Sequence, residues 1–95
     1  MNLEIGAGNS KIDGYIHTDA QDPSNLQNHH IEVRCKGEEL PFKNNIFYKI
    51  FMWGVFEHFT FPESLSVLSE CNRVLVIGGE LEFTTPDLIA VCKII

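Results

Sequence analysis

Short apolar or alternating segments along the chain predict five β-strands. They cover Met1–Ile5, Tyr15–Thr18, Ile31–Cys35, Phe47–Trp53 and Glu80–Thr85. The third and the fifth alternate apolar with polar residues, which is the period of a strand with one buried face. The fourth is rich in aromatic and branched residues, which favours a central strand buried on both faces.

One well-patterned helix is predicted over Pro62–Leu75. Pro62 suits the first helical position, and Glu63 favours the positive end of the helix dipole. Apolar residues then recur at helical spacing, at Leu65, Leu68, Cys71, Val74 and Leu75.

Two further signals concern the ends of helices. The pair Gly78-Gly79 is expected to end the first helix, and Asp87 is expected to cap a second helix over Leu88–Ile95. Strands interleaved with helices predict an α/β domain with a mostly parallel sheet of about five strands.

The size and charge of the chain limit its partners. At 95 residues it is expected to form a single domain over residues 1–95, and its hydrophobic fraction of 44% is typical of a globular domain. Seven basic against thirteen acidic residues give a formal net charge of -6. This balance disfavours binding to duplex nucleic acid or to an anionic membrane. The longest apolar stretch is also far short of the roughly 20 residues that span a membrane.

The cysteines and the first residues indicate a compartment. Cys35, Cys71 and Cys92 are odd in number and widely spaced, without a CxxC pair, which favours free thiols in a reducing environment. No basic start is followed by an apolar run, so no secretory signal is expected. A soluble, cytoplasmic protein is predicted.

The first predicted strand runs into a glycine turn at Gly6-Ala7-Gly8. Glycines let the backbone pass close to a ligand where a side chain would collide. In an open parallel sheet, ligands bind beyond the carboxyl ends of the strands. Taken alone, this segment leaves a second interpretation open, a simple tight turn with a solvated Glu4.

Asp19 follows the second predicted strand, which is expected to neighbour the first. A carboxylate at that position can accept hydrogen bonds from both hydroxyls of a ribose. The dinucleotide fingerprint needs a third glycine and an acid about 20 residues later. Here Lys11 stands at the third position and Asp19 comes much too early, so NAD and FAD fit poorly.

Four ordered segments resemble the class I SAM-dependent methyltransferases (SAM is S-adenosylmethionine). Residues 3–19, LEIGAGNSKIDGYIHTD, are similar to the opening of a branch whose first crossover is short. Residues 36–42 resemble the loop after the third strand, and residues 44–47 the approach to the fourth. Residues 55–59 resemble the fourth-strand segment, and residues 72–75 with 78–81 the helix-turn-fifth-strand unit. The resemblance implies a Rossmann-like fold, a truncated methyltransferase core, and SAM as cofactor.

The resemblance implies roles for residues of the first two strands. Gly6, Ala7 and Gly8 would line the methionine moiety of SAM, and Asp19 would bind the ribose hydroxyls. Glu4 would hold the loop, or the amino group of SAM through water.

It also implies roles for residues of the next two strands. Lys36, Gly37 and Glu38 would flank the adenine, and Trp53 and Gly54 would close the pocket.

The sequence departs from the family pattern at several positions. Lys36 stands where an aspartate is usual, and a lysine can only donate, so adenine contact would rely on the backbone or on Glu38. Tyr48 stands where an acid is common, and Val76-Ile77 replaces the usual lysine-proline. The last two strands of the family have no counterpart.

The histidines have two interpretations. His29-His30 lies in a polar segment and is expected to be solvated. Glu57-His58 could act as a base at the pocket rim, or could cap or orient a loop. No histidine and cysteine set has the spacing of a zinc site, so no metal is expected.

Two functions remain open. The first is a SAM-dependent methyltransferase that acts on a small-molecule or glycan-type acceptor. Alignment of the acceptor with the methyl carbon can supply much of the rate, so no catalytic residue is assigned. The alternative is a non-catalytic SAM- or nucleoside-binding module, or a degenerate methyltransferase-like core.

Self-association is also expected. Glu80–Thr85 would be an edge strand, and Leu88–Ile95 is too apolar to end in water without a covering surface. A homodimer joined near this edge, or a missing carboxy-terminal segment, would cover both.

Overall fold

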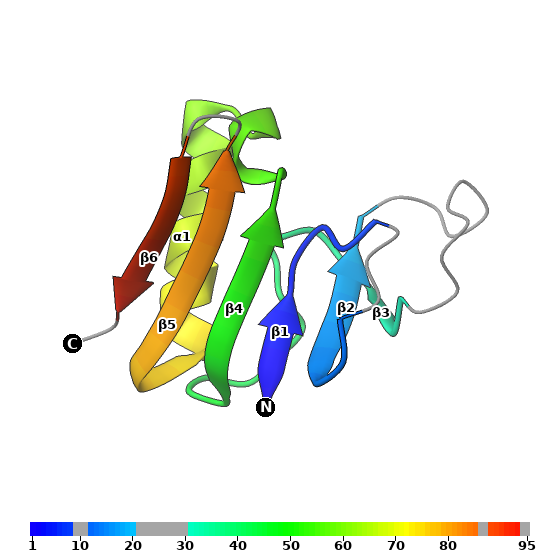
Figure 1. Ribbon diagram of the computed structural model, residues 1–95, viewed down its shortest axis with the longest axis vertical. Coiled ribbons are helices and arrows are strands. Elements are labelled where there is room, and N and C mark those ends of the chain that lie inside the picture. The colour runs from blue at the N-terminus through cyan, green and yellow to red at the C-terminus, as the bar shows by residue number, and fades with distance from the viewer. Residues whose placement is uncertain (9–11, 21–30, 86–87, 94–95) are drawn as a thin grey trace.

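The computed structural model describes residues 1–8, 12–20, 31–85 and 88–93. Its elements are β1 (Asn2–Glu4), β2 (Tyr15–Asp19), β3 (Val33–Arg34), β4 (Phe47–Trp53), the 3-10 helix η2 (Phe56–His58), α1 (Phe61–Val74), β5 (Leu75–Thr85) and β6 (Leu88–Lys93). The six strands form one sheet in the order β3-β2-β1-β4-β5-β6 (Figure 1). Strands β1 to β5 are parallel, and β6 is antiparallel to β5. The predicted α/β fold with a mostly parallel sheet is confirmed, with six strands where about five were expected.

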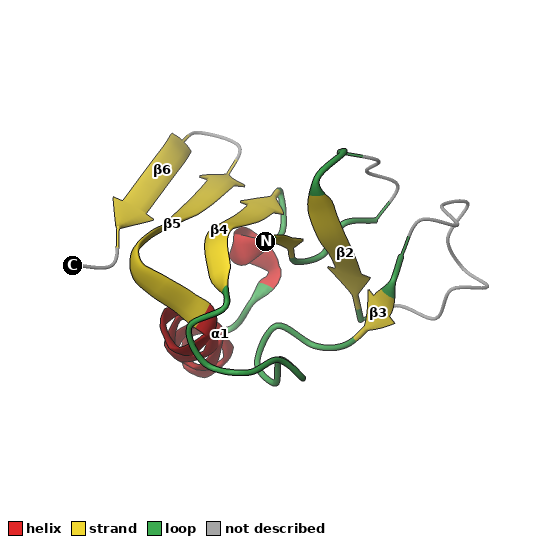
Figure 2. Cartoon of the chain, turned by 90° about the horizontal axis from the view of Figure 1, so that it is seen from below, coloured by secondary structure: helices red, strands yellow, loops and turns green. Residues whose placement is uncertain are grey.

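The core lies between the sheet and α1, which covers one face of it (Figure 2). Leu3 of β1 is paired with Ile50 of β4, and both side chains are fully buried. Successive residues of a strand point to opposite faces, so Glu4 is directed away from the face that Leu3 and Ile5 share. This alternation separates the apolar core from the polar side chains discussed below.

A capping box starts α1 at Thr60. The Thr60 hydroxyl accepts from the Glu63 N–H, and the Glu63 carboxylate accepts from the Thr60 N–H at 2.8 Å. The helix begins one residue before the predicted Pro62. Its buried face is formed by Val67, Cys71 and Val74. The prediction that Leu65 and Leu68 belong to the buried face is wrong, because both are exposed.

Leu75 ends α1, which corrects the prediction that Gly78-Gly79 would do so. Leu75 has extended backbone angles and is paired with Phe47 of β4, and both side chains are buried. Burial of two large apolar side chains in the sheet outweighs continuation of the helix. Gly78, with φ of 85°, lies instead in an irregular part of β5, where the pairing with β4 shifts.

Residues 88–93 form strand β6, so the predicted helix over Leu88–Ile95 is wrong. The strand is paired with β5 from Thr85↔Leu88 to Glu80↔Lys93. A short apolar run is compatible with either state, and the unpaired backbone of β5 favours the strand. Asp87, the predicted cap, lies outside the described residues. Because β6 is paired with β5, the expectation that β5 is an edge strand is also wrong; among the described strands, β6 is the edge on this side of the sheet.

No helix among the described residues is long and apolar enough to cross a membrane.

Candidate functional site

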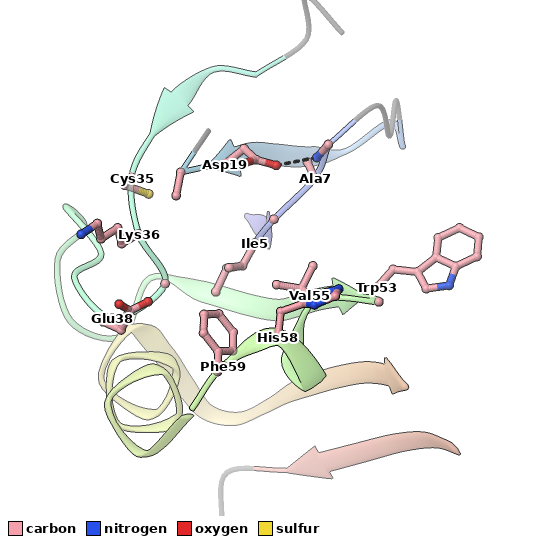
Figure 3. A pocket seen from close by; sticks show the side chains of 15 residues that line it. Ile5, Ala7, Asp19, Cys35, Lys36, Glu38, Trp53, Val55, His58 and Phe59 are labelled. Atoms are coloured by element: carbon pink, nitrogen blue, oxygen red, sulfur yellow. Dashed lines mark hydrogen bonds between the residues drawn. The ribbon is translucent and has the colours of Figure 1, made fainter. Parts of the chain in front are cut away.

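A cavity of about 510 Å³ lies where the strands β1, β2, β3 and β4 end (Figure 3). Five short segments form its walls: Ile5–Gly8, Asp19–Ala20, Cys35–Glu38, Trp53–Val55 and His58–Phe59. All the carboxyl ends of the parallel strands β1 to β4 lie at this edge of the sheet. The strand order reverses between β1 and β4, and such switch points are where open α/β sheets bind ligands.

The glycine turn forms the wall that follows β1. Gly6 and Gly8 have φ angles of 66° and 55°, in the left-handed region that favours glycine. A Cβ placed on Gly6 would lie 2.5 Å from Cγ2 of Val55, on the segment after β4. Gly6 therefore permits close packing between two walls of the cavity. Ala7 is held in place because its N–H donates to the Thr18 carbonyl at 2.8 Å.

Asp19 links the ends of β1 and β2. Its carboxylate accepts from the Gly8 N–H at 2.8 Å, and its side chain is buried beside the cavity (Figure 3). The bond fixes a negative charge at the end of β2, next to the glycine turn. Both groups line the cavity, as the sequence-based hypothesis requires.

Glu4 lies behind this loop and is not part of the cavity wall. The residue as a whole is 1% exposed, so the solvated Glu4 of the alternative interpretation is excluded. Its Oε1 lies 3.6 Å from Nε2 of the buried His17, a contact that the sequence did not predict. The carbonyl of Glu4 accepts from the Thr18 hydroxyl at 2.9 Å, which joins β1 to β2.

Lys36, Gly37 and Glu38 follow β3 and line the opposite wall. Gly37 is buried, and a Cβ placed on it would lie 3.3 Å from side-chain carbons of both Ile5 and Val67. This glycine thus allows the segment to pack onto the core, while the Lys36 side chain is exposed and Glu38 is half-buried.

Arg73 of α1 holds the chain just beyond this wall. Its guanidinium donates to the carbonyls of Leu40 and Phe42 at 2.9 and 2.7 Å, and to Glu70 at 2.6 Å. Glu70 in turn accepts from the Leu40 N–H at 2.8 Å. Hydrogen bonds from Arg73, opposed by partial burial, lower the pKa of Glu70 below its ordinary value. The pair anchors the segment that carries Lys36–Glu38.

Trp53 and Gly54 lie at the end of β4, on the rim. Trp53 is 66% exposed and its indole is turned outward in Figure 3, although the residue contributes to the wall. The Gly54 N–H donates to the Thr84 carbonyl at 3.3 Å, which ties the rim to β5.

His58 lines the cavity from η2 and is exposed. The side chain of Glu57 and both residues of His29-His30 lie outside the described part of the molecule. His58 thus lies at the rim, and whether the Glu57-His58 pair acts as a base or orients the loop stays a prediction.

Other wall residues escaped the sequence interpretation, namely Ile5, Ala20, Cys35, Val55 and Phe59. Their signal was only their place directly after a strand or near one. The cysteines are free. Cys71 is buried in the core, and this burial raises the pKa of its thiol to about 12. Among the described residues, no group of histidine, cysteine and acidic side chains could hold a metal ion.

Comparison with known proteins identifies the family. The model of a methyltransferase domain matches residues 3–83. No curated protein matches the sequence. Among solved structures, a Pyrococcus horikoshii protein has a TM-score of 0.73 at 16% identity, over 86% of this chain and 47% of that chain. A SAM-dependent methyltransferase of Thermotoga maritima has a TM-score of 0.71 at 22% identity, over 86% and 42%. The [4+2]-cyclase SpnF has a TM-score of 0.69 at 17% identity, over 88% and 38%.

This chain spans less than half the length of each of these three structures. At such low identities the structural likeness shows the fold alone. The family match extends over most of the chain and includes the glycine turn, Asp19 and the segment after β3. The chain therefore belongs to the methyltransferase-domain family, with the class I SAM-dependent methyltransferase fold.

Proposed function

We propose that this chain binds SAM in the cavity and supports transfer of its methyl group to a small-molecule or glycan-type acceptor. The observation that carries the proposal is the bond between the Asp19 carboxylate and the Gly8 N–H. It holds a carboxylate, which can accept hydrogen bonds from ribose hydroxyls, beside a glycine turn at the switch point of an open sheet.

The cavity fits the cofactor in size and in chemistry. Its volume of about 510 Å³ is within the range of small-molecule sites. The acidic Asp19 suits hydroxyl donors, and the glycine turn lets backbone approach the methionine part. Phe59 and Ile5 offer apolar surface between the side of the cavity proposed for the methionine part and the side proposed for the adenine. On the adenine side, the exposed Lys36 can donate but cannot accept, so Glu38 and backbone groups remain as the acceptors.

Bound SAM would supply an electrophilic methyl carbon on a sulfonium sulfur. The chain would hold the ribose through Asp19, place the methionine part against Gly6–Gly8, and exclude water with the walls around it. Such positioning can provide much of the rate of a transfer reaction. His58 stands at the rim, where a base could receive a proton from the acceptor.

A non-catalytic SAM- or nucleoside-binding module is the second candidate. Two observations favour it: Lys36 replaces the usual acidic residue, and the fold is shared with SpnF, which is described as a cyclase. A shared fold hosts different functions, so binding has to be measured before transfer.

Calorimetric titration with SAM and with S-adenosylhomocysteine (SAH) tests the proposal. Both ligands are expected to bind with a stoichiometry near one, and NAD under the same conditions is expected not to bind. Because SAH is the demethylated product, it reports the site without turnover. Absence of SAH binding by the folded chain, judged by circular dichroism, would contradict the proposal.

We also propose that two copies associate through β6, in the reducing cytoplasm that the three free cysteines favour. The strand is an edge of the described sheet, and Ile89 and Val91 are 72% and 51% exposed. Exposed edges of this kind invite pairing with another chain, and a two-fold axis would let one β6 pair with its copy. The opposite edge, β3, has only two residues and is less suited to this.

Sedimentation of the wild-type chain at micromolar concentration is expected to show a dimer. Val91→Lys places a charge in the middle of β6 and is expected to shift the equilibrium to monomer. The control is Leu65→Lys, which adds the same charge at an exposed position of α1 instead of β6. A wild-type chain that sediments as a monomer would contradict this association.

A further inference from the structure

A histidine between two carboxylates lies directly behind the cavity, in a place that no step of the proposed function uses. Nδ1 of His17 lies 3.0 Å from Oε2 of Glu32, and Nε2 lies 3.6 Å from Oε1 of Glu4. The backbone N–H of His17 also donates to Glu32 at 2.6 Å. The side chains of His17 and Glu4 are 7% and 2% exposed, whereas that of Glu32 is 51% exposed.

The protonation state of the imidazole decides whether this arrangement is favourable. A neutral imidazole has one N–H and one lone pair, so it can donate to only one of two carboxylates. The imidazolium can donate from both nitrogens and places a positive charge between two negative ones. Partial burial by itself raises the pKa of Glu32, but the hydrogen bonds from His17 lower it below the ordinary value. In this geometry only the imidazolium can donate toward both carboxylates.

The cluster joins three of the four strands whose ends form the cavity, β1, β2 and β3. Glu4 ends β1 and directly precedes the wall Ile5–Gly8, and His17 lies two residues before Asp19 on β2. Glu32 leads into β3, and its N–H donates to the His17 carbonyl at 3.0 Å. A shift of any of the three side chains would thus be transmitted to a wall of the cavity within a few residues.

The same strands are also joined at the cavity itself. The Cys35 N–H donates to the Asp19 carbonyl at 3.1 Å, and the Gly8 N–H to its carboxylate. Asp19 therefore takes its position from β1 and β3 as well as from its own strand. The contacts of His17 with Glu4 and Glu32 fix the spacing of these strands two residues before Asp19.

We propose that protonated His17 is a positioning residue of the cofactor cavity, and that cofactor affinity falls as His17 loses its proton. This inference rests on the proposed SAM site. The wild-type chain is expected to bind SAH most tightly on the acidic side of neutrality. Loss of the proton leaves a lone pair facing a carboxylate, which separates the strand ends and displaces Asp19 from Gly8.

Other titratable or charged groups lie around the cluster. On the neighbouring strands these are Glu4 of β1 and, at β3, Glu32 and the exposed Arg34, while β2 itself adds Tyr15 and Asp19. Carboxylates and arginine keep their charge near neutral pH, where histidine titrates. The ionisable groups of the ligand titrate in the same way in experiments on the wild type and on the variants. Variants at His17 and Glu32 therefore isolate the contribution of this histidine.

The experiment is a series of SAH titrations from about pH 5.5 to about pH 8.5, the range in which histidine gains and loses its proton. Wild-type affinity is expected to fall about tenfold over this range, the scale of one hydrogen bond to a charged group. His17→Asn is expected to bind about tenfold more weakly at the acidic end and to show a flat profile. If it does not fold, Glu32→Gln, at the half-exposed end of the cluster, is expected to reduce the slope.

Val74→Ala is the matched control, because it removes buried side-chain volume from α1 without touching the cluster. It is expected to lower the melting temperature but to keep the wild-type affinity and pH profile. A folded His17→Asn with wild-type affinity and slope would overturn the positioning role, whereas the proposed SAM site would stand. Failure of the wild-type chain to bind SAH at any pH would overturn the proposed site and this inference with it.

Discussion

Replacing Asp19 by alanine is expected to lower the affinity of the chain for SAH by about 10- to 150-fold. The carboxylate would accept hydrogen bonds from the ribose hydroxyls, and bonds to a charged group contribute about 1.5–3 kcal/mol, which corresponds to this range of dissociation constants. The variant also loses the 2.8 Å bond to the Gly8 N–H, so the glycine turn is less fixed before the ligand arrives. Isothermal titration calorimetry with SAH measures both the affinity and the enthalpy.

Two variants separate these effects. Asp19→Asn keeps one oxygen acceptor for the Gly8 N–H but has no negative charge, so an intermediate affinity is expected. Asp13→Ala changes an exposed aspartate on the turn before β2 and is expected to bind SAH as the wild type does. If Asp19→Ala remains folded and its affinity equals that of Asp13→Ala, the assignment of Asp19 to the ribose is wrong.

The glycine turn and Asp19 could be predicted because both depend on local signals. The turn follows an apolar strand, and Asp19 ends the next strand along the chain, which is also the next strand in the sheet. Neighbouring parallel strands end at the same edge, so their last residues meet without further information. The bounds of β4 were predicted correctly from its aromatic and branched residues, but the expected burial of both faces is wrong, because Tyr48 and Trp53 are 64% and 66% exposed.

The cluster behind the cavity could not be predicted in this way. His17 is buried, but nothing in the sequence pattern of its strand distinguishes it from a half-buried residue. Glu32 lies in a segment that alternates apolar with polar residues, as edge strands commonly do. Their contact depends on the register Glu4↔His17 and on the return of the chain to β3, which spacing alone does not specify. The resemblance implied that Glu4 holds the loop, but only the structure shows which residue its side chain faces.

The two wrong predictions about secondary structure share a physical cause. At Leu75 and over Leu88–Lys93, local patterns were compatible with a helix, and pairing with a neighbouring strand decided the outcome. Strand pairing depends on residues distant in the sequence, such as Phe47 for Leu75. Local propensity is a weak guide where a buried partner or an unpaired edge is available.

Arg73 shows how such a distant contact supports the cavity. Its guanidinium forms five hydrogen bonds, to Glu70 twice, to the carbonyls of Leu40 and Phe42, and to the Asn44 side chain at 2.9 Å. These acceptors lie about thirty residues earlier, except for Glu70 on the same helix. The planar guanidinium suits several acceptors at once, which a lysine cannot reproduce. The segment after β3 thus depends on α1 for its position.

Arg73→Ala is therefore expected to lower the free energy of unfolding by about 2–4 kcal/mol, since each bond contributes about 0.5–1.5 kcal/mol and the site is partly solvated. Urea unfolding at neutral pH measures this loss.

Glu70 has a lowered pKa in the folded chain, so the pair contributes its stability above the ordinary value of 4.5 and loses it as the pH falls below that value. The difference between wild type and variant is accordingly expected to shrink in acid. Arg34→Ala removes a single bond of 3.5 Å and is expected to change stability by less than about 0.5 kcal/mol. Equal stabilities of the two variants at neutral pH would show that Arg73 does not anchor the segment that carries Lys36–Glu38.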